Sequence, residues 1–125
     1  MTVEDAIESA EAILPGESAP VGEEDPRWQA IIAVGELIET DPLPIWEFVS
    51  KWGGHDDDDL RAAIATCLTE HLLQHHFDLI FPMVEARVDG DDRFRESVRQ
   101  CAKFGQAALT ENARRLDSLI DPQNM

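Results

Sequence analysis

Residues 70–78, with the sequence EHLLQHHFD, contain three of the four histidines of the chain. His71 and His75 are four residues apart, so on a helix both imidazoles would lie on one face and could reach a single metal ion. A third ligand would have to come from Glu70, Asp78 or another segment. A metal-dependent enzyme that uses His71 and His75 is therefore one hypothesis for this chain.

The same helix also offers His71 a purely structural role. At 100° per residue, His71 falls at the centre of an apolar stripe, with His75 beside it and His76 turned toward solvent. The stripe comprises Leu60, Ile64, Cys67 and Leu68. Because no Glu separates the pair as in the zinc-protease helix signature, we expect His71 to be a core residue. We expect no catalytic residue, no metal and no cofactor. A metal site at His71 and His75 is the alternative.

The acidic residues form the second group of interest. The chain has 26 acidic and 10 basic side chains and a net charge of −16. Residues 1–59 hold 16 acids against Arg27 and Lys51, a net charge of −14, so residues 60–125 carry only −2. We predict that the acids around the early helix starts bind a basic partner. The predicted partner-binding residues are Glu36, Glu39, Glu47, Asp56, Asp57, Asp58 and Asp59.

Two narrower interpretations of charged segments remain open. The run from Asp56 to Asp59 is typical of a helix start, where acids cap backbone amides and favour the helix dipole. Calcium binding is the alternative, although the run lacks the alternating ligands and central Gly of a calcium loop. Arg95, Arg99 and Lys103 follow at helical spacing and predict either a solvated face or a docking strip for acids.

Helix signals recur along the whole chain, which has no Tyr and little strand-like alternation. Pro15 and Gly16 end a first amphipathic helix, and Asp25-Pro26 and Asp41-Pro42 begin two others. The predicted helices cover residues 3–14, 26–38, 42–52, 57–75, 78–88 and 92–106, with a frayed helix at 108–119. We therefore predict two parts, an N-terminal helix with a mobile linker (1–24) and a helical domain (25–125).

The helix starts are also self-similar. Shifts of about 32 and about 34 residues align Asp25, Asp57 and Asp91, and likewise the small residues Gly35, Cys67 and Cys101. The segment DDLRAAIA, which begins at Asp58, resembles the second helix of a HEAT unit. The chain also resembles small bacterial proteins with a Trp-Glu-Phe-Val and Leu-Arg-Ala-Ala-Ile-Ala pattern. The resemblance implies an all-α fold of six to seven helices, a short right-handed HEAT-like α-solenoid of antiparallel helix pairs, and a protein-binding role.

Composition narrows the function classes. A strongly acidic chain repels nucleic-acid phosphates and anionic membrane surfaces, so we expect no direct nucleic-acid or membrane binding. Two cysteines are too few for a disulfide framework, and the first residues show no signal-peptide pattern, so we expect a cytoplasmic protein. The leading hypothesis is a non-catalytic interaction module. The alternative is an immunity-type inhibitor that neutralises a basic toxin or nuclease. The oligomeric state is left open.

Overall fold

The computed structural model describes residues 2–121, and all regular structure within them is helical. The helix bounds are α1 Val3–Glu11, α2 Pro26–Gly35, α3 Pro42–Trp52, α4 Asp58–Ile64, η1 Ala65–Thr69, α5 Glu70–His75, α6 Phe77–Val88, α7 Asp92–Arg99, η2 Gly105–Ala108 and α8 Thr110–Ile120. The elements α4, η1 and α5 follow one another without a break and form one long helix. The prediction of an all-α fold is confirmed. No helix in this part of the chain is both long and apolar enough to cross a membrane.

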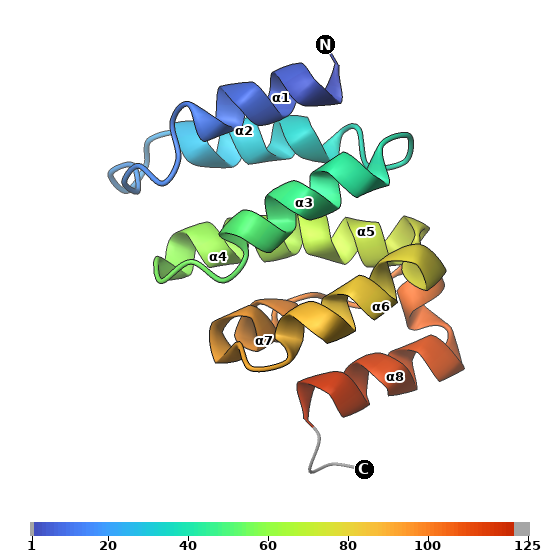
Figure 1. Cartoon of the computed structure of the whole chain (residues 1–125). Coiled ribbons are helices and arrows are strands. Elements are labelled where there is room, and N and C mark those ends of the chain that lie inside the picture. Colours follow the sequence, from blue (N-terminus) through green and yellow to red (C-terminus); the bar gives the residue numbers. More distant parts are fainter. Residues whose placement is uncertain (1, 122–125) are drawn as a thin grey trace.

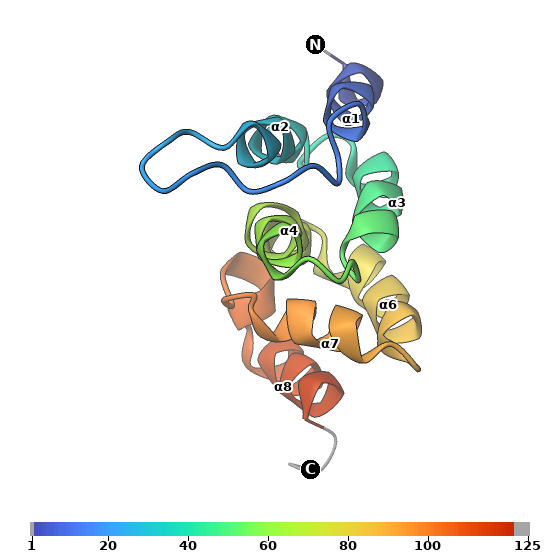
Figure 2. The ribbon, with the colours of Figure 1, turned by 90° about the vertical axis from the view of Figure 1, so that its left-hand side faces the viewer.

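The helices lie in two layers along most of the molecule. From α1 to α6, with α4, η1 and α5 taken as one helix, successive helices run in alternating directions (Figure 1). Helix α1 packs on α2 and α3, α2 and α3 both pack on α4, and α5 packs on α6. Seen from the side, α1, α3 and α6 lie one below another, while α2 and α4 form the opposite layer (Figure 2). The last two helices, α7 and α8, close the C-terminal end of the described chain.

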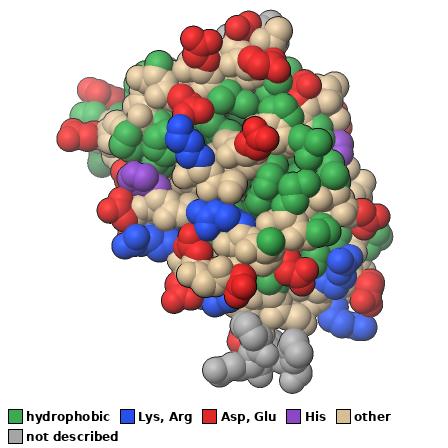
Figure 3. All heavy atoms as spheres, viewed as in Figure 1, with side chains coloured by type: hydrophobic (Ala, Val, Ile, Leu, Met, Phe, Trp, Pro, Cys, Tyr) green, Lys and Arg blue, Asp and Glu red, His purple; other side chains and the backbone are tan. Residues whose placement is uncertain are grey.

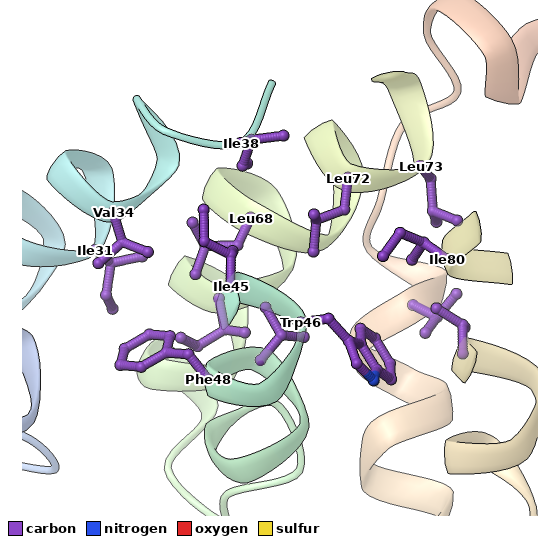
Figure 4. Packing of buried hydrophobic residues seen from close by; sticks show 14 of the residues in the cluster. Ile31, Val34, Ile38, Ile45, Trp46, Phe48, Leu68, Leu72, Leu73 and Ile80 are labelled. Carbon is purple, nitrogen blue, oxygen red and sulfur yellow. The ribbon is translucent and has the colours of Figure 1, made fainter. Parts of the chain in front are cut away.

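Helix α3 lies at the centre of the hydrophobic core. Ile45 and Phe48 lie on the side of Ile31 of α2 and Leu68 of the long helix, whereas Trp46 points to the opposite side of α3 (Figure 4). Trp46 also contacts Phe94 of α7 edge to face, with ring centroids 5.9 Å apart. Apolar burial on this scale stabilises a fold by about 1.5–3 kcal/mol for each large side chain. The core therefore joins the N-terminal and C-terminal helices through α3.

Helix α1 belongs to this core. Val3, Ala6 and Ala10 are buried, and α1 contacts both α2 and α3. Thr2 caps the helix as predicted, and its hydroxyl accepts a hydrogen bond from the Asp5 amide. Because α1 packs on α2 and α3, removing residues 1–24 would expose apolar surface of both helices.

A buried arginine holds the linker between α1 and α2 in place. Arg27 is only 3% exposed. Its Nη1 donates to the Pro15 carbonyl oxygen at 2.9 Å and to Asp57 Oδ2 at 3.0 Å. Its Nη2 donates to Ser18 Oγ at 2.8 Å and to Asp59 Oδ2 at 2.7 Å. One guanidinium thus ties the start of the linker to the beginnings of α2 and α4.

The long helix contains an extra residue at η1. In this π-helical segment the Glu70 amide donates to the Ala65 carbonyl, five residues back, instead of four. The hydroxyl of Thr69 reaches the Ile64 carbonyl across the same wide turn at 3.5 Å. One added residue rotates everything after it by about 100° relative to a regular α-helix. Face assignments made from Leu60 at 100° per residue are therefore wrong for the residues that follow Thr69.

Helix α7 ends at Arg99, seven residues before the predicted end at 106. Contacts with α5 replace the helical hydrogen bonds of the segment that follows. The Ala102 amide donates to Glu70 Oε1 at 2.7 Å, and the Gln106 side chain bridges the Phe77 amide and the His75 carbonyl. Gly105 has a φ of +52°, and a Cβ there would lie 2.9 Å from the Gln74 carbonyl oxygen. These long-range contacts override the local helical pattern.

Replacing Arg27 by Met should lower the free energy of unfolding by about 3 kcal/mol, because hydrogen bonds to charged groups contribute about 1.5–3 kcal/mol each. Urea denaturation measures the change. Arg93 is exposed and makes no ion pair within residues 2–121, so Arg93→Met serves as the control, with an expected change within about 0.5 kcal/mol. Equal effects of the two substitutions would contradict the role given to Arg27.

The contribution of Arg27 should also depend on pH. Its hydrogen bond lowers the pKa of the Asp57 carboxyl below the ordinary value. A lowered carboxyl pKa contributes stability that is complete above the ordinary pKa and is lost as the pH falls through the lowered one. The difference in unfolding free energy between the wild type and Arg27→Met should therefore shrink as the pH is lowered through the acid range. A difference that stays constant over that range would contradict the ion pair.

Candidate functional site

The predicted acidic surface does not form one continuous rim. Asp57 and Asp59 bind Arg27 of their own chain, and Asp59 also accepts a hydrogen bond from Trp28 Nε1 at 3.0 Å. Asp58 pairs with Arg61 on the same helix. Asp56 is exposed, with Oδ1 3.2 Å from His55 Nδ1. Three of the four acids at the start of α4 thus pair with arginines of the chain itself.

Glu47 belongs to a different surface, an open groove of about 710 Å³ between α1 and α3. Its floor is mostly apolar, and acidic side chains stand along its edges. The groove is lined by Glu4, Ile7, Glu8, Glu11, Pro44, Glu47, Phe48 and Lys51. The face that carries α1, α3 and α6 is shown in Figure 3, where hydrophobic side chains gather across the middle and acidic ones over the α1 end.

Most of the acids in this groove lack a basic partner. Glu11 pairs with Lys51, the one basic residue in the lining. Within residues 2–121, Glu4, Glu8 and Glu47 form no ion pair. Sequence reasoning found Glu47 but missed Glu4 and Glu8. The available signal was the spacing of Glu4, Glu8 and Glu11, which are four and three residues apart and therefore share one helix face.

Glu36 and Glu39 lie in a second groove, of about 480 Å³, between α2 and the η1–α5 segment. The groove also contains Cys67, His71 and His75, so the structure brings two predicted acids together with both predicted metal candidates. His75 Nδ1 lies 3.5 Å from Glu39 Oε1. Burial, followed by the nearby Glu70, raises the pKa of the Cys67 thiol. The reactive thiolate form is therefore disfavoured, and this thiol is a poor nucleophile.

His71 is not a core residue, which corrects the sequence prediction. Its side chain is 42% exposed, and its Nδ1 lies 3.0 Å from Gln74 Oε1. The π-helical turn at η1 moves Leu72 to the position that the regular wheel assigned to His71, and Leu72 is fully buried. His76, predicted to meet solvent, is half-buried with Nε2 2.9 Å from the Ile38 carbonyl oxygen.

No metal-binding cluster was found among the described residues 2–121, in the sense of three or more His, Cys, Asp or Glu side chains placed to hold one ion. His71 and His75 line the wall of an open groove, and the nearest acid of each is a separate glutamate, Glu70 for His71 and Glu39 for His75. The two imidazoles therefore lie near different carboxylates, and no single acid among the described residues lies near both of them as a third metal ligand would.

The predicted basic strip is also divided. Arg95 and Arg99 lie on α7 and pair with Asp92 and Glu96 of the same helix. Lys103 lies beyond the end of α7 and pairs with Asp117 of α8, with Nζ and Oδ1 2.7 Å apart. Each of these three basic residues therefore pairs with an acid of the chain itself, and Lys103 lies outside the helix that carries the other two.

No protein-family model matches this chain, and no match was found among curated proteins or among solved structures. The function is therefore inferred from the surfaces described above.

Because the π-helical turn exposes His71 and buries Leu72, alanine substitutions at these two neighbouring residues should differ strongly in their effect on stability. His71→Ala should change the free energy of unfolding by no more than about 0.5 kcal/mol, as is usual for a largely exposed side chain. Leu72→Ala should lower it by about 2–5 kcal/mol, because a buried side chain is lost and a cavity is left. Urea denaturation of both variants is the measurement. A larger loss of stability for His71→Ala than for Leu72→Ala would contradict the π-helical turn and support a regular α-helix with His71 in the core.

Proposed function

We propose that this chain is a non-catalytic interaction module that binds a basic protein partner through the groove between α1 and α3. The observation that carries the proposal is the lining of this groove. Glu4, Glu8 and Glu47 stand over an apolar floor without a basic partner among residues 2–121. Opposite charge on a partner would be attracted to these carboxylates, and the apolar floor would be covered on binding.

The proposed architecture is a short HEAT-like array, in which helix pairs stack side by side and leave their outer grooves open. Two features support it. Asp25, Asp57 and Asp91 begin α2, α4 and α7 with the same side-chain cap. Gly35 lies where a Cβ would come within 3.0 Å of the Cys67 carbonyl oxygen, so aligned small positions meet at a helix contact.

The charge distribution favours a basic protein over a nucleic acid as the partner. The groove carboxylates would repel phosphates, and most arginines of the second half pair with acids of the chain itself. An inhibitor that neutralises a basic toxin or nuclease is one form of this function, since such a target would present clustered Lys and Arg side chains to the groove. We propose no catalytic role and no cofactor.

Charge reversal in the groove tests this function. The variant Glu4→Lys/Glu8→Lys/Glu47→Lys should lose most capture of basic proteins from a lysate of the source organism, as quantified by mass spectrometry. The control Asp78→Lys/Glu85→Lys/Asp89→Lys changes the net charge equally at exposed acids of α6 and the turn after it, and should retain capture. Capture should also vanish in about 1 M salt, where the Debye length is about 3 Å.

The control also defines the contradicting result. If both triple variants lose capture equally, net charge alone attracts the captured proteins, and the groove has no specific role. If neither variant loses capture, the acidic groove is not the binding surface.

A further inference from the structure

We infer that the occupant of the groove between α1 and α3 is a basic amphipathic helix of the partner protein. This inference rests on the proposed function and specifies the partner's structure. It is carried by three properties of the groove: an apolar floor, acidic edges at helical spacing, and walls made of two helices.

The apolar floor requires an apolar stripe on the occupant. Ile7 of α1 and Pro44 of α3 are half-buried, and Phe48 closes the base between them. Neither of the two walls contributes a polar uncharged side chain to the lining. Water over such a floor is displaced favourably only by another apolar surface, at about 25 cal/mol for each Å² removed from water. A purely hydrophilic basic segment would leave this part of the groove unfilled.

The acidic edges require positive charge on both sides of that stripe. Glu4 and Glu8 lie four residues apart on α1, and Glu47 lies on α3 across the floor, whereas Glu11 already pairs with Lys51. At a rise of about 1.5 Å per residue, Glu4 and Glu8 are spaced by about 6 Å along the helix axis. Lys or Arg residues at intervals of four on a second helix have the same spacing.

The walls favour a helix over an extended chain. An extended peptide must pair its backbone amides and carbonyls, and it usually does so at the edge of a sheet. The walls of this groove are helices, whose backbone groups are already paired within α1 and α3. A helix satisfies its own backbone and presents only side chains to the groove. With α3 at 11 residues, the matching length is about three turns.

A designed peptide tests the inference with the full chain. The probe is a dye-labelled 18-residue peptide of Leu and Lys, with Leu at helical spacing on one face and both termini blocked. Two control peptides are a scrambled sequence of the same composition, which has no apolar face, and a version with Glu in place of Lys. Fluorescence anisotropy at about 50 mM salt measures binding. The helical Leu–Lys peptide should bind at least tenfold more tightly than the scrambled peptide, and the Glu peptide should not bind.

Variants of the protein locate the site. Glu8→Lys/Glu47→Lys should weaken binding of the Leu–Lys peptide more than tenfold, whereas the matched control Asp78→Lys/Glu85→Lys should change it less than threefold. Circular dichroism and thermal melting confirm that each variant is folded. Circular dichroism should also show a gain of helix in the peptide on binding, beyond the sum of the free components.

Three outcomes would overturn the inference. If the scrambled peptide binds as tightly as the helical one, and Glu8→Lys/Glu47→Lys weakens both, the groove attracts basic chains without selecting a helix, and the proposed function stands. If neither peptide binds, or the groove variant changes nothing, the proposed function fails at this site as well. If sedimentation shows a dimer of the chain that Glu8→Lys/Glu47→Lys dissociates, the occupant is a second copy of the chain.

Discussion

The N-terminal half of this fold depends on one buried guanidinium. Arg27 is a rare case of a basic residue in a segment with a large excess of acids, and it is almost completely inaccessible to solvent. Two carboxylates at the start of α4 and two oxygens of the linker surround it. Burying a charge is costly unless it is paired and hydrogen-bonded, so the linker and the start of α4 must both remain in place.

The candidate binding groove follows from this constraint. Because Arg27 holds the linker at Pro15 and Ser18, α1 returns along α2 and α3 and buries Val3, Ala6 and Ala10 against them. The opposite side of α1 then forms one wall of the groove, with α3 as the other. The same arginine pairs with Asp57 and Asp59 at the start of α4. The acids that line the candidate groove without a basic partner among residues 2–121 are those on α1 and α3.

Local signals predicted the helix starts well. Asp25, Asp57 and Asp91 begin their helices because a carboxylate can accept from free amides within three residues, an interaction that the sequence alone reveals. Predictions failed where distant contacts end a helix or where the helix departs from regular α geometry. The end of α7 is set by Glu70 and Gln106 across the fold, and the π-helical turn places Leu72, not His71, in the core. The sequence also did not reveal that Asp57 and Asp59 pair with Arg27, a residue about thirty positions earlier.

The dependence of α1 on Arg27 can be measured directly by hydrogen exchange. Amide exchange is followed residue by residue in the wild type and in Arg27→Met under native conditions, and protection in α1 is compared with protection in α6. If Arg27 anchors the linker and through it α1, the substitution will reduce protection in α1 by a larger factor than in α6, because a local opening is added to the global one. An equal loss of protection in both helices, or unchanged protection in α1, would contradict the dependence of the groove on this arginine.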